Sequence, residues 1–189
     1  MVGVLALQGN YQMHSDILSY IGQDSIFVKK TSDLSKCKGL IIPGGESTVI
    51  SKLMIRYDLL ESIKKFSNTK SIFVTCAALI LMTNYKYDNI DSLNILNMDV
   101  DRNAWGSQID SFTENIEVDL GDVKNDFKAT FIRAPKIKKI SNSITVLSKI
   151  NKNPVMIREG RHIATTFHPE MHGDPLIHKY FLKIINEDE

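Results

Sequence analysis

The sequence predicts an α/β fold: an open, mostly parallel sheet with helices on both faces, carrying an antiparallel extension in its second half. Two observations lead to this prediction. In the first half, short apolar runs alternate with helical patterns, which is typical of parallel strands joined by crossover helices. In the second half, between about residues 95 and 167, short strand patterns follow one another with turn residues between them, which favours antiparallel pairing.

The first strand and helix are visible at the start of the chain. VGVLAL (2–7) is a continuous apolar run, as expected of a strand buried on both faces. Ile17, Leu18 and Ile21 then recur at helical spacing, and Gly22 supplies a stop. A strand followed by a helix that ends near Gly22 is therefore expected.

Three more strands follow in the same manner. They are SIFVK (25–29), GLIIPGGES (39–47), which runs into a glycine turn, and SIFVT (71–75). Ser47 and Thr48 are N-cap candidates for a helix after the glycine turn, and another helix is expected from about Ala77. This alternation predicts the parallel part of the sheet.

The remaining strands and the last helix complete the prediction. The strand patterns are IEVDL, ATFIRAP, ITVLSKI, PVMIREG and HIATTF, and Pro175 to Asn186 has a helical pattern. We see no internal repeat and no low-complexity linker. The chain is therefore expected to form a single domain over residues 1–189.

Composition excludes several classes of function. Apolar residues make up 43% and charged residues 24%, with a net charge of +1, so there is no basic surface for nucleic acid or anionic lipid. No apolar run is long enough to cross a bilayer, and the N-terminus lacks the features of a signal peptide. The two cysteines, Cys37 and Cys76, do not form a disulfide framework or a metal-spaced cluster. We expect a cytoplasmic protein with reduced thiols and no metal or other cofactor.

Four segments lie where strands are expected to end, at the edge where open α/β sheets bind ligands: QGN (8–10), PGGES (43–47), TCAA (75–78) and FHPE (167–170). In the third, Cys76 could be a nucleophile at a sharp turn or simply a small buried side chain, because free cysteines are commonly buried. The Gly-Gly pair of the second could present backbone N–H groups to an oxyanion or could be an ordinary turn.

The last of these segments contains a candidate base. His168 and Glu170 are two residues apart, so in extended backbone their side chains project to the same side and the carboxylate could orient the imidazole. The alternative is a surface histidine at a strand end. His14, His162, His172 and His178 have no comparable partner in the sequence, and His172 and His178 are expected to face solvent around the last helix.

Taken together, the ordered motifs resemble the class I glutamine amidotransferases, and more closely the glutaminase subunit of the two-protein pyridoxal 5′-phosphate synthase. The motifs are GVLALQGN, LIIPGGEST, the TCA segment, VDRNAWGSQIDSF (100–112), FIRAP (131–135) and FHPE. They span nearly the whole chain. Each motif alone is modest, and their order makes the resemblance specific.

The resemblance implies a role for each matching residue in hydrolysis of L-glutamine to L-glutamate and ammonia. Cys76 would be the nucleophile, His168 the base that activates it, and Glu170 the group that orients His168. Further implied roles are an oxyanion hole of the Gly45 and Ala77 amides, and a glutamine site of Gly45, Glu46, Ser47, Arg102, Ile132 and Arg133. Ammonia would pass to a (β/α)8-barrel synthase partner in a hetero-oligomer.

The chain departs from the family pattern G-T-C-A-G around its nucleophile, because Val74 and Ala78 replace the two glycines. Small neighbours let strand and helix approach closely at a nucleophile elbow, so the extra bulk predicts strain of about 1–3 kcal/mol. A 1 Å displacement of Cys76 could slow the reaction on the order of 100-fold. Ser107, where the family often has arginine, puts one local ion pair in question.

Three alternatives to an active glutaminase subunit of the synthase remain open at this point. Val74 and Ala78 favour a catalytically weak or silent homologue that serves the synthase as a binding or regulatory subunit. A glutaminase of another pathway is disfavoured by the RN…SF and IRAP segments. A peptidase or chaperone of the same broad fold would not need Glu46, Arg102 and Arg133 together.

Overall fold

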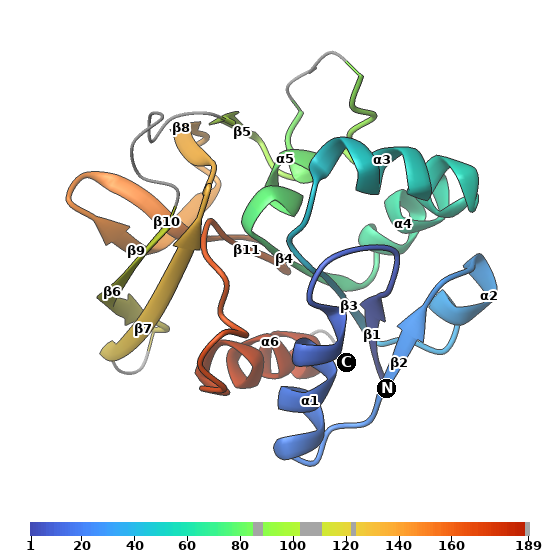
Figure 1. Cartoon of the computed structure of the whole chain (residues 1–189), viewed down its shortest axis with the longest axis horizontal. Helices are drawn as coiled ribbons and strands as arrows, with labels where there is room; N and C mark the ends of the chain where they lie inside the picture. The colour runs from blue at the N-terminus through green and yellow to red at the C-terminus, as the bar shows by residue number, and fades with distance from the viewer. Residues whose placement is uncertain (85–88, 103–110, 122–123, 188–189) are drawn as a thin grey trace.

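A computed structural model describes residues 1–84, 89–102, 111–121 and 124–187 and has a seven-stranded sheet at its centre (Figure 1). Strands β2, β1, β3, β4 and β11 run parallel, and β10 and β9 continue the sheet antiparallel. From one edge to the other, the strands are β2 (Ser25–Val28), β1 (Val2–Leu5), β3 (Gly39–Ile42), β4 (Ser71–Thr75), β11 (His162–Thr165), β10 (Asn153–Glu159) and β9 (Ile144–Ile150).

Helices cover both faces of this sheet, each over its own apolar core. Successive residues of β4 point to opposite faces: Val74 packs with the core under α3, α4 and α5, and Phe73 packs with the core under α1 and α6. Figure 1 shows α1 and α6 side by side on one face. The helices are α1 (Tyr11–Tyr20), α2 (Thr31–Leu34), α3 (Ser47–Arg56), α4 (Leu59–Ser67), α5 (Leu79–Met82) and α6 (Leu176–Glu187), with a 3-10 turn, η1 (Cys76–Ala78), before α5.

Two small antiparallel pairs extend the second half of the chain. β5 (Met98–Asp101) pairs with β8 (Lys136–Ile140), and β6 (Ser111–Asp119) pairs with β7 (Lys124–Ile132). The predicted fold class, a mostly parallel sheet with helices on both faces and an antiparallel extension, is therefore confirmed. Within the described residues, no helix is long and apolar enough to cross a membrane.

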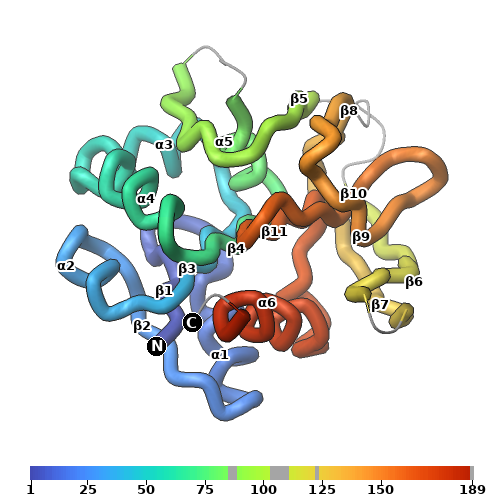
Figure 2. The backbone as a smooth tube through the Cα atoms, turned by 180° about the vertical axis from the view of Figure 1, so that it is seen from behind, coloured from blue at the N-terminus to red at the C-terminus, as the bar shows by residue number. Residues whose placement is uncertain are grey.

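Three local features differ from the sequence-based expectations. HIATTF supplies β11, which lies beside β4 in the middle of the sheet and parallel to it, as the view from behind also shows (Figure 2). The helix after the glycine turn has Glu46 as its N-cap residue, without a side-chain cap, so the N-cap assigned to Ser47 or Thr48 was wrong. That helical region is also divided in two by Asp58, whose φ of 57° is left-handed and ends α3 before α4 begins.

Candidate active site

The carboxyl ends of the parallel strands surround a pocket of about 680 Å³. It receives residues from the loop after β1, the glycine turn after β3, the turn after β4 and the end of β7, which are far apart in the sequence. All predicted site residues except Glu170 line it: Gly45, Glu46, Ser47, Cys76, Ala77, Arg102, Ile132, Arg133 and His168. The structure thus brings together the four segments that the sequence analysis selected.

Cys76 occupies a strained turn directly after β4. Its φ is 49°, a left-handed conformation that is unusual for a residue with a side chain. Such strain is typical of a nucleophile elbow, where a sharp strand-to-helix turn presents the reactive atom. Cys76 Sγ lies 3.6 Å from the backbone oxygen of Ile132, which can accept the thiol proton.

The two residues that replace the family's glycines are accommodated in the core beside this turn. Val74 and Ala78 are both fully buried in the core on the α3–α4 side of the sheet. Val74 is paired with Ile42 on β3 and with Ala164 on β11. Ala164 on the same face has a small side chain, and Cys76 adopts its left-handed conformation with Val74 two residues before it.

His168 is buried and fixed at both its backbone and its ring. Its backbone N–H donates to the carbonyl of Thr130 over 2.9 Å, and its Nδ1 lies 2.8 Å from Glu170 Oε1. Burial alone would lower the pKa of His168, but the hydrogen bonds and charges of Cys76 and Glu170 raise it to about 10. This imidazole is therefore a strong acceptor for the Cys76 proton, and the alternative of a surface histidine is wrong.

Glu170 lies behind His168, away from the pocket, and is 1% exposed. Although burial opposes ionisation, the hydrogen bond from His168, the charge that His14 carries at acid pH and the charge of His168 lower the pKa of Glu170 to about 2. Asn10 donates a second hydrogen bond to the same carboxylate oxygen over 3.3 Å. The carboxylate is ionised at neutral pH and oriented toward the His168 ring.

The glycine turn after β3 must pass very close to these side chains. A Cβ at Gly44 would lie 2.8 Å from Cys76 Cβ and 3.0 Å from His168 Cε1, so any side chain there would displace the nucleophile or the base. The Gly44 N–H donates to Thr75 Oγ1 over 2.8 Å, which ties the turn to the end of β4. Glycine is therefore required at this position by the close approach of Cys76 and His168.

Three polar residues hold the site together and were given no role from the sequence. Gln8 accepts a hydrogen bond from the Glu46 N–H over 2.8 Å, Asn10 contacts Glu170, and Thr75 accepts from Gly44. Gln8 and Asn10 belong to the segment QGN, and Thr75 belongs to TCAA, so position at a strand end was the available signal. The partner of each could be identified only from the fold.

The predicted substrate-binding residues stand around the mouth of the pocket. Glu46 and Arg133 are exposed and Arg102 is partly buried, whereas Ser47 is buried. Arg133 has a φ of 43° and is a second left-handed residue that lines the pocket. Carboxylate and guanidinium groups at one mouth suit a zwitterionic ligand. Ser107 lies outside the described residues.

Two histidines differ from their predicted surroundings. His178 was expected to face solvent but is fully buried, and its ring contacts His14 of α1. His14 is also fully buried; its Nδ1 lies 2.9 Å from His178 Nε2 and its Nε2 lies 3.4 Å from Glu170 Oε2. The expectation that His178 faces solvent was therefore wrong, and the sequence did not indicate the partners of either ring. His172 is exposed, as expected, and contacts Thr130 Oγ1 over 2.7 Å.

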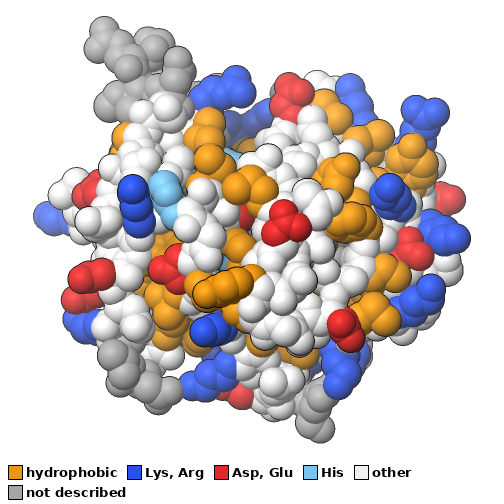
Figure 3. Space-filling model, turned by 60° about the horizontal axis from the view of Figure 1, so that its bottom comes forward, with side chains coloured by type: hydrophobic (Ala, Val, Ile, Leu, Met, Phe, Trp, Pro, Cys, Tyr) orange, Lys and Arg blue, Asp and Glu red, His pale blue; other side chains and the backbone are white. Residues whose placement is uncertain are grey.

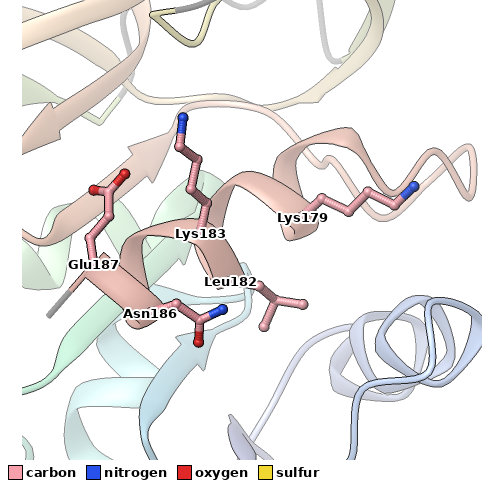
Figure 4. A pocket seen from close by; sticks show the side chains of 5 residues that line it. All are labelled: Lys179, Leu182, Lys183, Asn186 and Glu187. Atoms are coloured by element: carbon pink, nitrogen blue, oxygen red, sulfur yellow. The ribbon is translucent and has the colours of Figure 1, made fainter. Parts of the chain in front are cut away.

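Two other hollows among the described residues contain no cysteine, and one of them, of about 480 Å³, has Glu61, Lys64 and His162 among its lining residues. A groove of about 520 Å³ runs along α6, but its five side chains all come from that helix and fan out in different directions (Figure 4). On the face shown in Figure 3, acidic and basic side chains of the described residues are interspersed with hydrophobic ones. The pocket at the strand ends is therefore the candidate active site.

Comparison with known proteins agrees with this geometry. The chain is 44% identical to the pyridoxal 5′-phosphate synthase subunit PdxT of Oenococcus oeni, over 100% of this chain and 98% of the relative. It is 40% identical to the PdxT subunit of Thermus thermophilus, over 97% of each chain. A crystal structure of a glutamine amidotransferase superposes with a TM-score of 0.91 at 38% identity, covering 98% of both chains. The family model for the SNO glutamine amidotransferase family matches residues 4–187, so the chain belongs to that family.

Proposed function

We propose that this protein is the glutaminase subunit of a pyridoxal 5′-phosphate synthase, hydrolysing L-glutamine to L-glutamate and ammonia with one glutaminase domain over residues 1–189. The observation that carries the proposal is the arrangement of Cys76, His168 and Glu170. A strained cysteine faces a buried imidazole, which an ionised carboxylate orients. This is the general arrangement of an activated nucleophile.

The first half of the reaction forms a thioester. The Cys76 proton passes to His168, and Sγ attacks the side-chain amide carbon of glutamine. The backbone N–H groups of Gly45 and Ala77 stabilise the tetrahedral oxyanion, a contribution of about 3 kcal/mol for each donor. His168 then gives its proton to the leaving nitrogen, the C–N bond breaks, and ammonia departs.

The second half returns the enzyme to its starting state. His168 takes a proton from a water molecule, the resulting hydroxide attacks the thioester, and a second tetrahedral intermediate collapses to glutamate and the Cys76 thiol. These steps balance with glutamine and water alone. Glutamine is held by the side chains or backbone of Gly45, Glu46, Ser47, Arg102, Ile132 and Arg133, all of which line the pocket.

The partner follows from the relatives, which are named as subunits of pyridoxal 5′-phosphate synthase over their full length. We place the chain beside a (β/α)8-barrel synthase subunit, which receives the ammonia and builds the cofactor. The free thiols of Cys37 and Cys76 agree with a cytoplasmic location.

The test is glutamate release from L-glutamine by the purified protein, with and without the synthase barrel, beside a Cys76→Ala control. Release that the barrel stimulates and that Cys76→Ala abolishes supports the proposal. A stable complex with no release above the control would instead support a silent binding subunit, the alternative favoured by Val74 and Ala78.

A further inference from the structure

Behind the catalytic carboxylate lies a pair of histidines that the proposed mechanism does not use. His14 comes from α1 and His178 from α6, two helices that lie side by side in both backbone views (Figures 1 and 2). Both rings are fully buried. His178 Nε2 lies 2.9 Å from His14 Nδ1, and His14 Nε2 lies 3.4 Å from Glu170 Oε2, so the polar groups form a chain that ends at the carboxylate.

The two oxygens of Glu170 are held differently. Oε1 is contacted by His168 Nδ1 over 2.8 Å and by Asn10 Nδ2 over 3.3 Å. Among the described residues, Oε2 and His14 Nε2 are both buried without a hydrogen bond of ordinary geometry, yet they face each other at 3.4 Å. A shift of a few tenths of an ångström would join them, and catalytic hydrogen bonds are commonly long before substrate binds.

The protonation of the two rings follows from burial. Burial lowers the pKa of His14 to about 4, although the Glu170 charge raises it, and burial lowers the pKa of His178 to about 3. Each ring is therefore neutral at pH 7 and carries one N–H. Because a carboxylate can only accept, the His14 proton belongs on Nε2, and His178 must then donate from its Nε2 to His14 Nδ1.

Apolar packing alone does not explain these two imidazoles. Both rings pack edge-on against Phe73, at 6.2 Å for His14 and 5.8 Å for His178. A phenylalanine or leucine could fill such a space without burying polar nitrogens, whose unsatisfied burial costs about 1–3 kcal/mol each. The hydrogen-bonded chain toward Glu170 uses three of the four ring nitrogens, and His178 Nδ1 alone is buried without a partner among the described residues.

We propose that His14 is a positioning residue for Glu170, and that His178 holds His14 in the tautomer whose Nε2–H points at Glu170 Oε2. The inference rests on the proposed glutaminase function, because His14 acts through Glu170 on the base His168. A carboxylate anchored at both oxygens cannot rotate, so the hydrogen bond to His168 keeps its direction while the ring moves a proton. His14 itself does not touch glutamine.

Two substitutions of His14 separate this role from simple packing. Gln in His14→Gln can donate to Glu170 through its amide N–H and accept from His178 through its oxygen, whereas His14→Leu does neither. We expect His14→Leu to lower kcat about 10- to 100-fold with KM changed less than about threefold, and His14→Gln to recover most of the loss. His162→Gln, on β11 and outside the pocket, removes an imidazole as a matched control and should retain wild-type turnover.

An NMR titration supplies a readout that packing alone would not change. In His14→Leu the pKa of His168 should fall by roughly one unit, because its carboxylate partner loses an anchoring hydrogen bond, and in His14→Gln it should return toward the wild-type value. Imidazole nitrogen shifts should also show His14 neutral and protonated at Nε2. Wild-type pKa and kcat in His14→Leu, or a His14 proton on Nδ1, would overturn the proposal.

His178→Phe gives a second route should His14→Leu fail to fold. It leaves the contact between His14 and Glu170 but removes the donor to His14 Nδ1, so nitrogen shifts should show a mixture of His14 tautomers. A single Nε2–H tautomer in His178→Phe would overturn the role of His178. If wild-type protein with its barrel partner releases no glutamate, the proposed function fails, and the titration of His168 still decides the positioning role.

Discussion

The Glu170 carboxylate separates two sides of the same site that differ in character. On the pocket side, Cys76 and His168 meet a lined opening with charged residues at its mouth. On the buried side, His14 and His178 lie in an apolar core, and burial keeps both neutral. The difference indicates two roles. The residues that line the pocket carry out the chemistry, whereas the buried histidines restrict how the carboxylate can move.

The largest effect is expected where the two sides meet, at Glu170→Gln. The amide keeps the shape but loses the charge that supports a protonated His168, so the pKa of His168 should fall and kcat should decrease on the order of 1,000-fold. Glutamate release measures the rate. Glutamine binding, measured by calorimetry, is the control that tests whether the pocket is intact. A decrease of less than about tenfold would mean that orientation by the carboxylate is unimportant here.

The turn at Cys76 allows a test of whether the bulk of Val74 and Ala78 in the core slows the reaction in the pocket. We expect Val74→Gly with Ala78→Gly to raise glutaminase turnover, by at most about 100-fold, because relieving bulk lets Cys76 adopt the family's geometry. Val74 is fully buried beside Ile42 and Ala164, so its loss leaves a cavity. The free energy of unfolding of the same double variant should therefore decrease by about 2–4 kcal/mol. Glutamate release measures the turnover, and thermal unfolding measures the loss of stability. A folded double variant that is no faster would show that the elbow tolerates both residues.

At the mouth of the pocket, Glu46→Gln should act on binding. Its carboxylate is expected to contact the α-amino group of glutamine, far from the amide that reacts, so KM should rise about 10- to 30-fold while kcat changes less. Glu61→Gln is a matched control, because Glu61 pairs with Lys64 on α4 and lies outside the pocket. An unchanged KM in Glu46→Gln would remove this residue from the glutamine site.

The pocket side could be predicted from the sequence because its residues mark the ends of strands. Cys76 follows an apolar run, Gly45 lies in a glycine turn, and His168 and Glu170 are two residues apart. Their contact was predicted, although it forms in a turn after β11 and not in extended backbone as expected. Those signals are local. The fold then had only to bring the carboxyl ends of neighbouring strands together, which a parallel sheet does by its topology.

The buried side could not be predicted in the same way. His14 is distant in the sequence from both Glu170 and His178, and its contacts depend on α1 packing beside α6 and the turn after β11. His178 stands between apolar residues of an amphipathic helix, where its side cannot be assigned from one polar ring. The position of β11 beside β4 likewise depends on a long-range pairing that strand propensity does not encode.

The smallest effect is a change in how stability depends on pH. Unfolded histidines take up protons near pH 6.5, whereas burial holds the pKa of His178 at about 3 and that of His14 at about 4. Their contribution is present above pH 6.5 and declines as the pH falls toward 4, by up to about 1.4 kcal/mol per pH unit for each ring. The raised pKa of His168 acts with the opposite sign and adds little slope below about pH 5.5, where that ring is protonated in both states. His178→Phe should therefore reduce the slope by about half between pH 6 and 5, as measured by urea unfolding. An equal slope in wild type and variant would show that His178 titrates normally in the folded protein.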